Sequence, residues 1–210
     1  MRVTFPRLAD HQKGYAVIER DDGVVYRMDG FTVVGRELPH DLRHLIVERE
    51  LRVRDGIFGA IAAGTVWTSM HHVRGRRPPH SADRSDQLKR AQRERIMRAE
   101  LLANLVEEVA ARDAPTDAEI QRLTRTKLNV VPVVEPGADP ADVIALPPAA
   151  ALAAAASALQ VEAARWARLR VGDELAYEWP SANPGTARAL RAVPRQRGGE
   201  PARRHPHRRR

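Results

Sequence analysis

A hairpin near the N-terminus places the first constraint on the fold. Strand-forming residues at 15–20 and 24–28 flank Asp21-Asp22-Gly23, and an Asp-Gly pair between two such runs is typical of a β-hairpin. Apolar residues around 3–5 predict a short strand before it, which Pro6 ends. The chain is therefore expected to begin with antiparallel strands.

The region near 173–179 predicts a further strand at the other end of the chain. Leu175, Tyr177 and Trp179 alternate with polar or small residues, which is the pattern of a strand buried on one face only. Its natural partner is the N-terminal hairpin. We therefore expect residues 1–180 to form one α+β domain, with a small antiparallel sheet packed against about five helices.

The segment between the strands carries helical patterns. The predicted helices cover residues 38–54, 57–67, 81–112, a short stretch from 116 and the Ala-rich stretch 149–170. A basic, proline-containing loop is expected at 71–80, and the five prolines of 130–148 predict an extended connector. Thr116 and Glu119 have the spacing of a capping box.

Basic charge is concentrated at the C-terminus. The chain has 35 Lys and Arg against 27 Asp and Glu, and residues 181–210 hold nine arginines and one glutamate, which leaves 26 of each sign in residues 1–180. We therefore expect 181–210 to be a disordered Arg-rich tail that makes weak contact with polyanions. The chain has no cysteine, which excludes thiolate chemistry and disulfides.

The richest chemistry lies in the helix predicted from residue 38. At 100° per residue, His40, His44 and Glu48 fall at about 0°, 40° and 80°, and Asp41 at about 100°. Histidines four residues apart can bind one metal ion, as in the His-Glu-x-x-His motif of zinc peptidases. One hypothesis is therefore a metal-dependent hydrolase, with His40 and His44 as ligands of a divalent metal such as zinc and Asp41 or Glu48 as the base.

This helix alone does not complete a three-ligand site. Positions i, i+4 and i+8 span about 12 Å along the axis, which is too far for His40, His44 and Glu48 to reach one ion. The third ligand is therefore expected from elsewhere, with candidate histidines at His71, His72 and His80. Glu48 is then free to orient His44.

A structural explanation covers the same residues. Asp41 is favoured in a first helical turn by the helix dipole, and Asp41 or Glu48 can hydrogen-bond His44. Apolar residues flank the histidines on both sides, which predicts a partly buried groove. The preferred hypothesis for the function is therefore a non-enzymatic, soluble protein with a partner- or ligand-binding groove beside His40 and His44. The absence of a signal peptide or membrane-length apolar run predicts a cytoplasmic protein without membrane contact.

Two other stretches have alternative interpretations. Glycine and alanine dominate residues 56–64. Because glycine destabilises a helix, its presence there indicates that a neighbouring segment packs closely against the backbone. We therefore predict a tight helical hairpin between this segment and the histidine helix. Nine basic residues between 74 and 98 are a candidate weak nucleic-acid surface together with the tail, but a solvated helix face and loop is the preferred explanation for them.

The motif Pro39-His40-Asp41-Leu42-x-His44-x-x-Val47-Glu48-Arg49-Glu50-Leu51, followed by Gly56-x-x-Gly59-x-x-Ala62-Ala63-Gly64, resembles a family of uncharacterised proteins from high-GC bacteria. The resemblance covers about 30 residues. It implies no known activity, so the function has to be inferred from the residues themselves.

Overall fold

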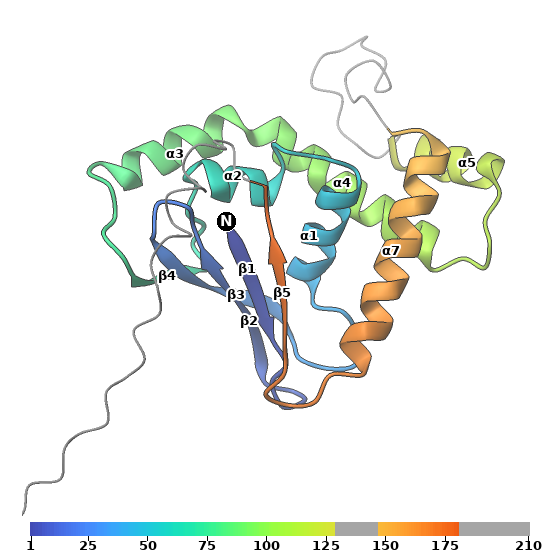
Figure 1. The fold of residues 1–210 in the computed structure, drawn as a ribbon. Helices are drawn as coiled ribbons and strands as arrows, with labels where there is room; N and C mark the ends of the chain where they lie inside the picture. The colour runs from blue at the N-terminus through green and yellow to red at the C-terminus, as the bar shows by residue number, and fades with distance from the viewer. Residues whose placement is uncertain (129–146, 181–210) are drawn as a thin grey trace, which may run out of the picture.

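The computed structural model describes residues 1–128 and 147–180. Within them, a five-stranded sheet packs against helices (Figure 1), which confirms the predicted α+β class. The strands are β1 (Arg2–Pro6), β2 (Lys13–Glu19), β3 (Val25–Val33), β4 (Met70–Arg74) and β5 (Glu174–Glu178). The helices are α1 (His40–Glu50), α2 (Ile57–Ala63), α3 (Ser81–Ala91), α4 (Arg93–Ala110), α5 (Asp117–Leu128) and α7 (Ala149–Ala167).

The sheet is antiparallel throughout and has the order β4-β3-β2-β1-β5. Val3 of β1 pairs with Ile18 of β2 on one side and with Tyr177 of β5 on the other. Both predicted parts of the sheet are therefore present. The C-terminal strand pairs with β1, however, and not directly with the β2–β3 hairpin.

Side-chain alternation separates a buried sheet face from an exposed one. Val3 and Phe5 of β1 and Leu175 and Tyr177 of β5 are buried, whereas the adjacent Arg2, Glu174 and Glu178 are exposed. Helices α1, α4 and α7 lie to one side of the sheet in Figure 1, and their buried residues belong to the same hydrophobic cluster as those of the strands. The described segments therefore share one core. The predictions for the tail at 181–210 and for most of the connector lie outside the described residues.

The loop predicted at 71–80 is wrong in its first part, because β4 pairs there with the outer edge of β3. Residues 71–74 are exposed on both faces of the strand. An edge strand of this kind buries no alternating set of side chains, so its sequence carries no two-residue apolar period.

Two helix boundaries also differ from the prediction. The helix expected at 81–112 is interrupted at Gln92, whose φ is −107°. On one side of the break, α3 buries only Ser85, whereas α4 packs an apolar stripe into the core. Helix α2 ends at Ala63, and Gly64 follows it with a φ of 122° that favours glycine.

The capping box at the start of α5 is confirmed. The backbone N–H of Glu119 donates to Thr116 Oγ1 at 3.3 Å, and the backbone N–H of Thr116 donates to Glu119 Oε2 at 2.8 Å. Two otherwise unpaired donors at this helix end are therefore satisfied reciprocally.

Across residues 1–128 and 147–180, none of the helices combines the length and the apolar character needed to cross a membrane.

Candidate metal centre between α1 and α4

Helix α1 is buried on more than one side, as its two apolar flanks predicted. Leu42, Leu45 and Ile46 are buried in the core. Two polar residues of the same helix, His44 and Glu48, are buried with them, at 3% and 1% exposure. Polar groups buried this deeply need partners, and these two residues have partners of different kinds.

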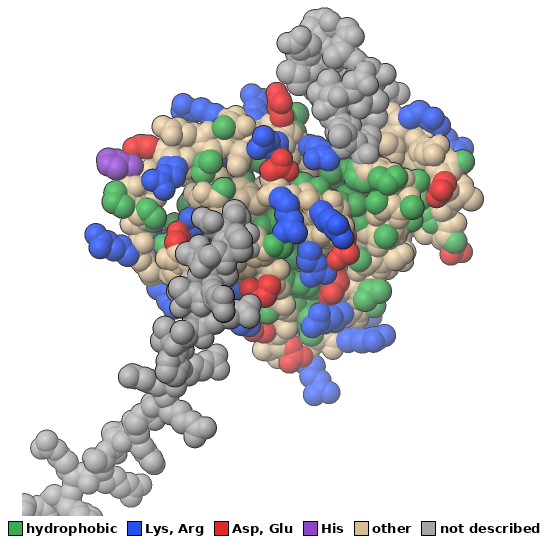
Figure 2. Space-filling model, turned by 45° about the horizontal axis from the view of Figure 1, so that its top comes forward, with side chains coloured by type: hydrophobic (Ala, Val, Ile, Leu, Met, Phe, Trp, Pro, Cys, Tyr) green, Lys and Arg blue, Asp and Glu red, His purple; other side chains and the backbone are tan. Residues whose placement is uncertain are grey.

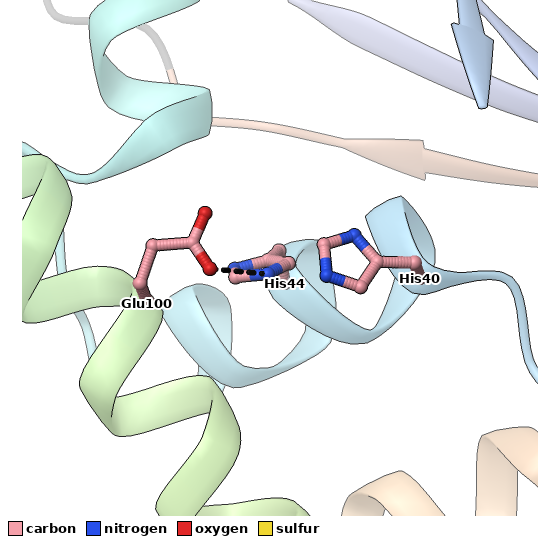
Figure 3. A group of neighbouring side chains, drawn as sticks. All are labelled: His40, His44 and Glu100. Carbon is pink, nitrogen blue, oxygen red and sulfur yellow. Dashed lines mark ion pairs between the residues drawn. The ribbon is translucent and has the colours of Figure 1, made fainter. Parts of the chain in front are cut away.

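His44 lies between His40 and Glu100. The rings of His40 and His44 are 4.6 Å apart between centroids, and His44 Nε2 is 3.3 Å from Oε2 of Glu100 on α4 (Figure 3). One potential ligand atom from each of the three residues lies within 4.8 Å of the other two. We call His40, His44 and Glu100 the His–His–Glu cluster.

The cluster is electrostatically matched but incompletely hydrogen-bonded. The hydrogen bond from His44 lowers the pKa of the Glu100 carboxyl, aided by the nearby imidazoles and opposed by partial burial. Glu100 is therefore a carboxylate at neutral pH. The Nδ1 atoms of His40 and His44 are both buried, and neither has a hydrogen-bond partner among the described residues. Each imidazole thus keeps one uncommitted nitrogen inside the protein.

The cluster opens to solvent on two of its members. The side chain of His44 is 4% exposed, whereas those of His40 and Glu100 are 36% and 46% exposed. A small ion or ligand therefore has access from the His40 and Glu100 sides, while His44 forms the buried floor.

Glu48 does not join the cluster, although the helical wheel placed it on the same face. Its Oε1 and Oε2 accept the backbone N–H groups of Ile57 and Phe58 at 2.9 and 3.1 Å. The carboxyl therefore caps the first turn of α2 from a neighbouring helix. Burial outweighs these donors and raises its pKa to about 8.

Two glycines make this contact sterically feasible. A Cβ on Gly56 would lie 2.6 Å from Cδ of Glu48, and a Cβ on Gly59 would lie 1.9 Å from the carbonyl oxygen of Arg54. The close approach predicted from the small residues is therefore present. The neighbours, however, are a carboxylate and the loop before α2, and not the backbone of the histidine helix.

Asp41 lies at the edge of the cluster. Its Oδ1 is 3.6 Å from Nδ1 of His40, which is too long for a hydrogen bond. Its side chain is 15% exposed and borders a shallow depression that also contacts Pro39, Val34 and Trp166. This depression lies beside the histidine helix and has a volume of about 20 Å³, which is room for about one water molecule.

The third ligand was expected from His71, His72 or His80, and this prediction is wrong, because none of the three reaches the cluster. His71 is held on β4 with its Nε2 3.3 Å from Asp29, and His72 Nε2 is 2.8 Å from the Gly75 carbonyl. His80 is 84% exposed, 3.9 Å from Asp83. Glu100 takes the third position instead. No local pattern singled out Glu100 within the predicted helix 81–112, because only the packing of α4 on α1 brings it to His44.

The basic residues between 74 and 98 are partly neutralised. Arg74, Lys89 and Arg95 lie within 4 Å of Glu19, Asp86 and Asp55 respectively. Figure 2 shows Lys and Arg interspersed with Asp and Glu over one face of the molecule. Mixed charges of this kind favour a solvated surface over a track for a phosphate backbone.

Comparison with known proteins adds no relative. No family model matches the chain, and neither a curated protein nor a solved structure matches it. The resemblance to proteins of high-GC bacteria stays a prediction.

Proposed function

We propose that this protein binds one divalent transition-metal ion, best matched by zinc, through His40, His44 and Glu100. The observation that carries the proposal is the convergence of three ligand atoms within 4.8 Å of one another, one of them on the buried imidazole of His44. Two imidazoles and a carboxylate form a donor set that zinc uses in sites with an open fourth position.

The distances support this donor set. Two ligands of a tetrahedral zinc ion are about 3.4 Å apart when each bond is about 2.1 Å, and His44 Nε2 and Glu100 Oε2 are 3.3 Å apart. His40 is the more distant ligand, and its partly exposed ring has room to turn toward the other two. The ionised state of Glu100 and the neutral imidazoles would leave one net positive charge on the loaded site.

Metal analysis of the full chain, purified without an affinity tag, tests the proposal. We expect about one zinc ion per chain in the wild type, and zinc affinity at least about 100-fold weaker in a His40→Ala/Glu100→Gln variant. Both side chains are partly exposed, so this variant is expected to fold, whereas a His44 substitution would leave a cavity in the core.

The matched control is His71→Ala/His80→Ala, which removes two histidines outside the cluster. Substoichiometric zinc at equal levels in all three proteins would reject the metal site. It would leave the non-enzymatic partner- or ligand-binding groove as the better hypothesis.

Hydrolysis is a second candidate function, favoured by the position of Asp41 beside His40 at the shallow depression. Zinc held by three protein ligands lowers the pKa of a bound water to about 7. Of the two predicted bases, Asp41 is the one that lies next to a cluster residue, His40. Glu48 is not available for this role, because its carboxyl accepts backbone N–H groups of α2. Zinc-dependent cleavage of p-nitrophenyl acetate that falls in Asp41→Asn without loss of bound zinc would support this role. Equal cleavage by the two proteins would refute it.

A further inference from the structure

A second hollow lies on the other side of Phe31 from the His–His–Glu cluster. Its volume is about 360 Å³, and it is lined by Lys13, Asp29, Gly30, Phe31, Thr68, Ser69 and His71. These residues come from the start of β2, the end of β3, the α2–β4 loop and β4. The antiparallel pairing of β3 with both β2 and β4 brings them together.

Donor groups without partners are concentrated in this hollow. The ammonium of Lys13 and the hydroxyls of Thr68 and Ser69 make no hydrogen bond or ion pair within residues 1–128 and 147–180. The hydroxyls can donate through their O–H groups, and the lysine offers three N–H donors and one positive charge. Three polar residues thus converge on one space with hydrogen-bonding capacity unused.

Asp29 is the only carboxylate among the described residues that line the hollow, and both of its oxygens are already engaged. Asp29 Oδ1 accepts from Arg27 Nε at 3.0 Å, and Asp29 Oδ2 lies 3.3 Å from His71 Nε2. Arg27 in turn lies over the ring of Tyr15, 4.2 Å from its centroid. The formal charges of Lys13 and Asp29 in the lining sum to zero, but Arg27 and His71 engage the carboxylate, so the ammonium of Lys13 is left without an ion-pair partner among the described residues.

Phe31 adds an apolar wall that solvent would otherwise contact. Its side chain is 79% exposed, and its outward-facing ring touches His40 edge-on at 6.0 Å between centroids. A single exposed aromatic side chain is ordinary on a protein surface, but this one forms part of the wall of the hollow. A ligand with a flat or apolar part can therefore pack on Phe31 while its charged group faces Lys13.

We propose that this hollow binds the oxyanion group, phosphate or carboxylate, of a ligand whose apolar part packs on Phe31. Lys13 supplies the charge, Thr68 and Ser69 donate through their hydroxyls, and His71 closes the side next to Asp29. The proposal goes beyond the metal site and does not depend on it, although a ligand in this hollow would border His40 through Phe31.

Nuclear magnetic resonance titration of ¹⁵N-labelled, metal-free full chain tests the proposal with four probes: inorganic phosphate, acetate, phenyl phosphate and benzoate. We expect saturable shifts of the Ser69 and Phe31 amides, with an aromatic probe binding more tightly than the matching small ion. The oxyanion is a phosphate if inorganic phosphate and phenyl phosphate bind more tightly than acetate and benzoate. It is a carboxylate if the order is reversed.

Variants separate the two halves of the site. Lys13→Ala should weaken binding of every anion by about tenfold, and Phe31→Ala should weaken only the aromatic probes, by about three- to tenfold. Lys89→Ala, which removes an exposed lysine on α3, is the matched control and should change nothing. Absence of saturable shifts with all four probes, or affinities unchanged by Lys13→Ala, would overturn the proposal. Because chelator is present throughout, neither outcome bears on the zinc site.

Discussion

Two buried polar groups one turn apart on α1 differ in how they are satisfied. Glu48 uses both carboxylate oxygens to accept backbone N–H groups at the start of α2, so its environment is fully explained by the fold. Among the described residues His44 has one polar partner, Glu100, besides its ring contact with His40. The Nδ1 atoms of both histidines are buried without a hydrogen bond to any of these residues. Burial alone therefore does not identify a functional residue. A buried group with unused bonding capacity next to solvent is the better indicator.

The comparison predicts opposite consequences when each group is removed. Glu48 should contribute to stability and not to metal binding, whereas His40 and Glu100, the exposed members of the His–His–Glu cluster, should contribute to metal binding with little effect on the stability of the metal-free protein.

The largest expected effect is on stability. Glu48→Ala leaves the N–H groups of Ile57 and Phe58 without acceptors in a buried setting, so the free energy of unfolding should fall by about 3 kcal/mol at pH 7. Urea denaturation measures this value. Glu50→Ala, on the exposed side of the same helix, is the control and should change it by no more than about 0.5 kcal/mol. Equal losses in the two variants would contradict a capping role for Glu48.

The raised pKa of Glu48 predicts a pH dependence of stability. Between pH 4.5 and 8 the unfolded chain has released the Glu48 proton while the folded chain still holds it, because burial raises the folded pKa to about 8. The folded state then binds more protons, so its stability falls as pH rises through this window. Glu48→Gln, which has no such proton, should lack this contribution.

The measurement is the free energy of unfolding of both proteins by urea at pH 6 and pH 8. The wild type should lose about 2 kcal/mol more than Glu48→Gln over this interval. Parallel pH profiles for the two proteins would show that Glu48 is ionised in the folded state at pH 6.

Zinc binding should stabilise the folded protein by a smaller amount than these two effects of Glu48. At a free zinc concentration ten times the dissociation constant, binding to the folded state alone adds about 1.4 kcal/mol. Thermal denaturation with and without zinc should show this gain in the wild type and in Glu50→Ala, but not in His40→Ala/Glu100→Gln. A zinc-dependent gain of equal size in the cluster variant would place the metal elsewhere.

The smallest expected effect is that of His40→Ala in metal-free protein. Its side chain is 36% exposed and its Nδ1 makes no hydrogen bond in the described part of the chain, so the free energy of unfolding should change by no more than about 0.5 kcal/mol. Urea denaturation in the presence of a chelator measures it. A loss of several kcal/mol would show that His40 is a structural residue like Glu48.

Local patterns were sufficient to predict the elements that bury one face. The Asp-Gly hairpin, the alternation around Leu175 and Tyr177, and the capping box at Thr116 depend on residues close in sequence, and all three are present. Edge strand β4 and the break at Gln92 were not predicted, because exposed strands and interrupted helices leave no periodic apolar signal.

The sequence by itself determined that His40 and His44 share a helix face, because a spacing of four residues fixes that geometry in any α-helix. It also determined that no third ligand comes from the same helix, since the rise per residue is too large. The tertiary structure decided what meets each side chain: the N-terminus of α2 meets Glu48, and Glu100 of α4 meets His44. The physical reason is that these partners come from other helices, and helix packing depends on contacts between residues far apart in the chain.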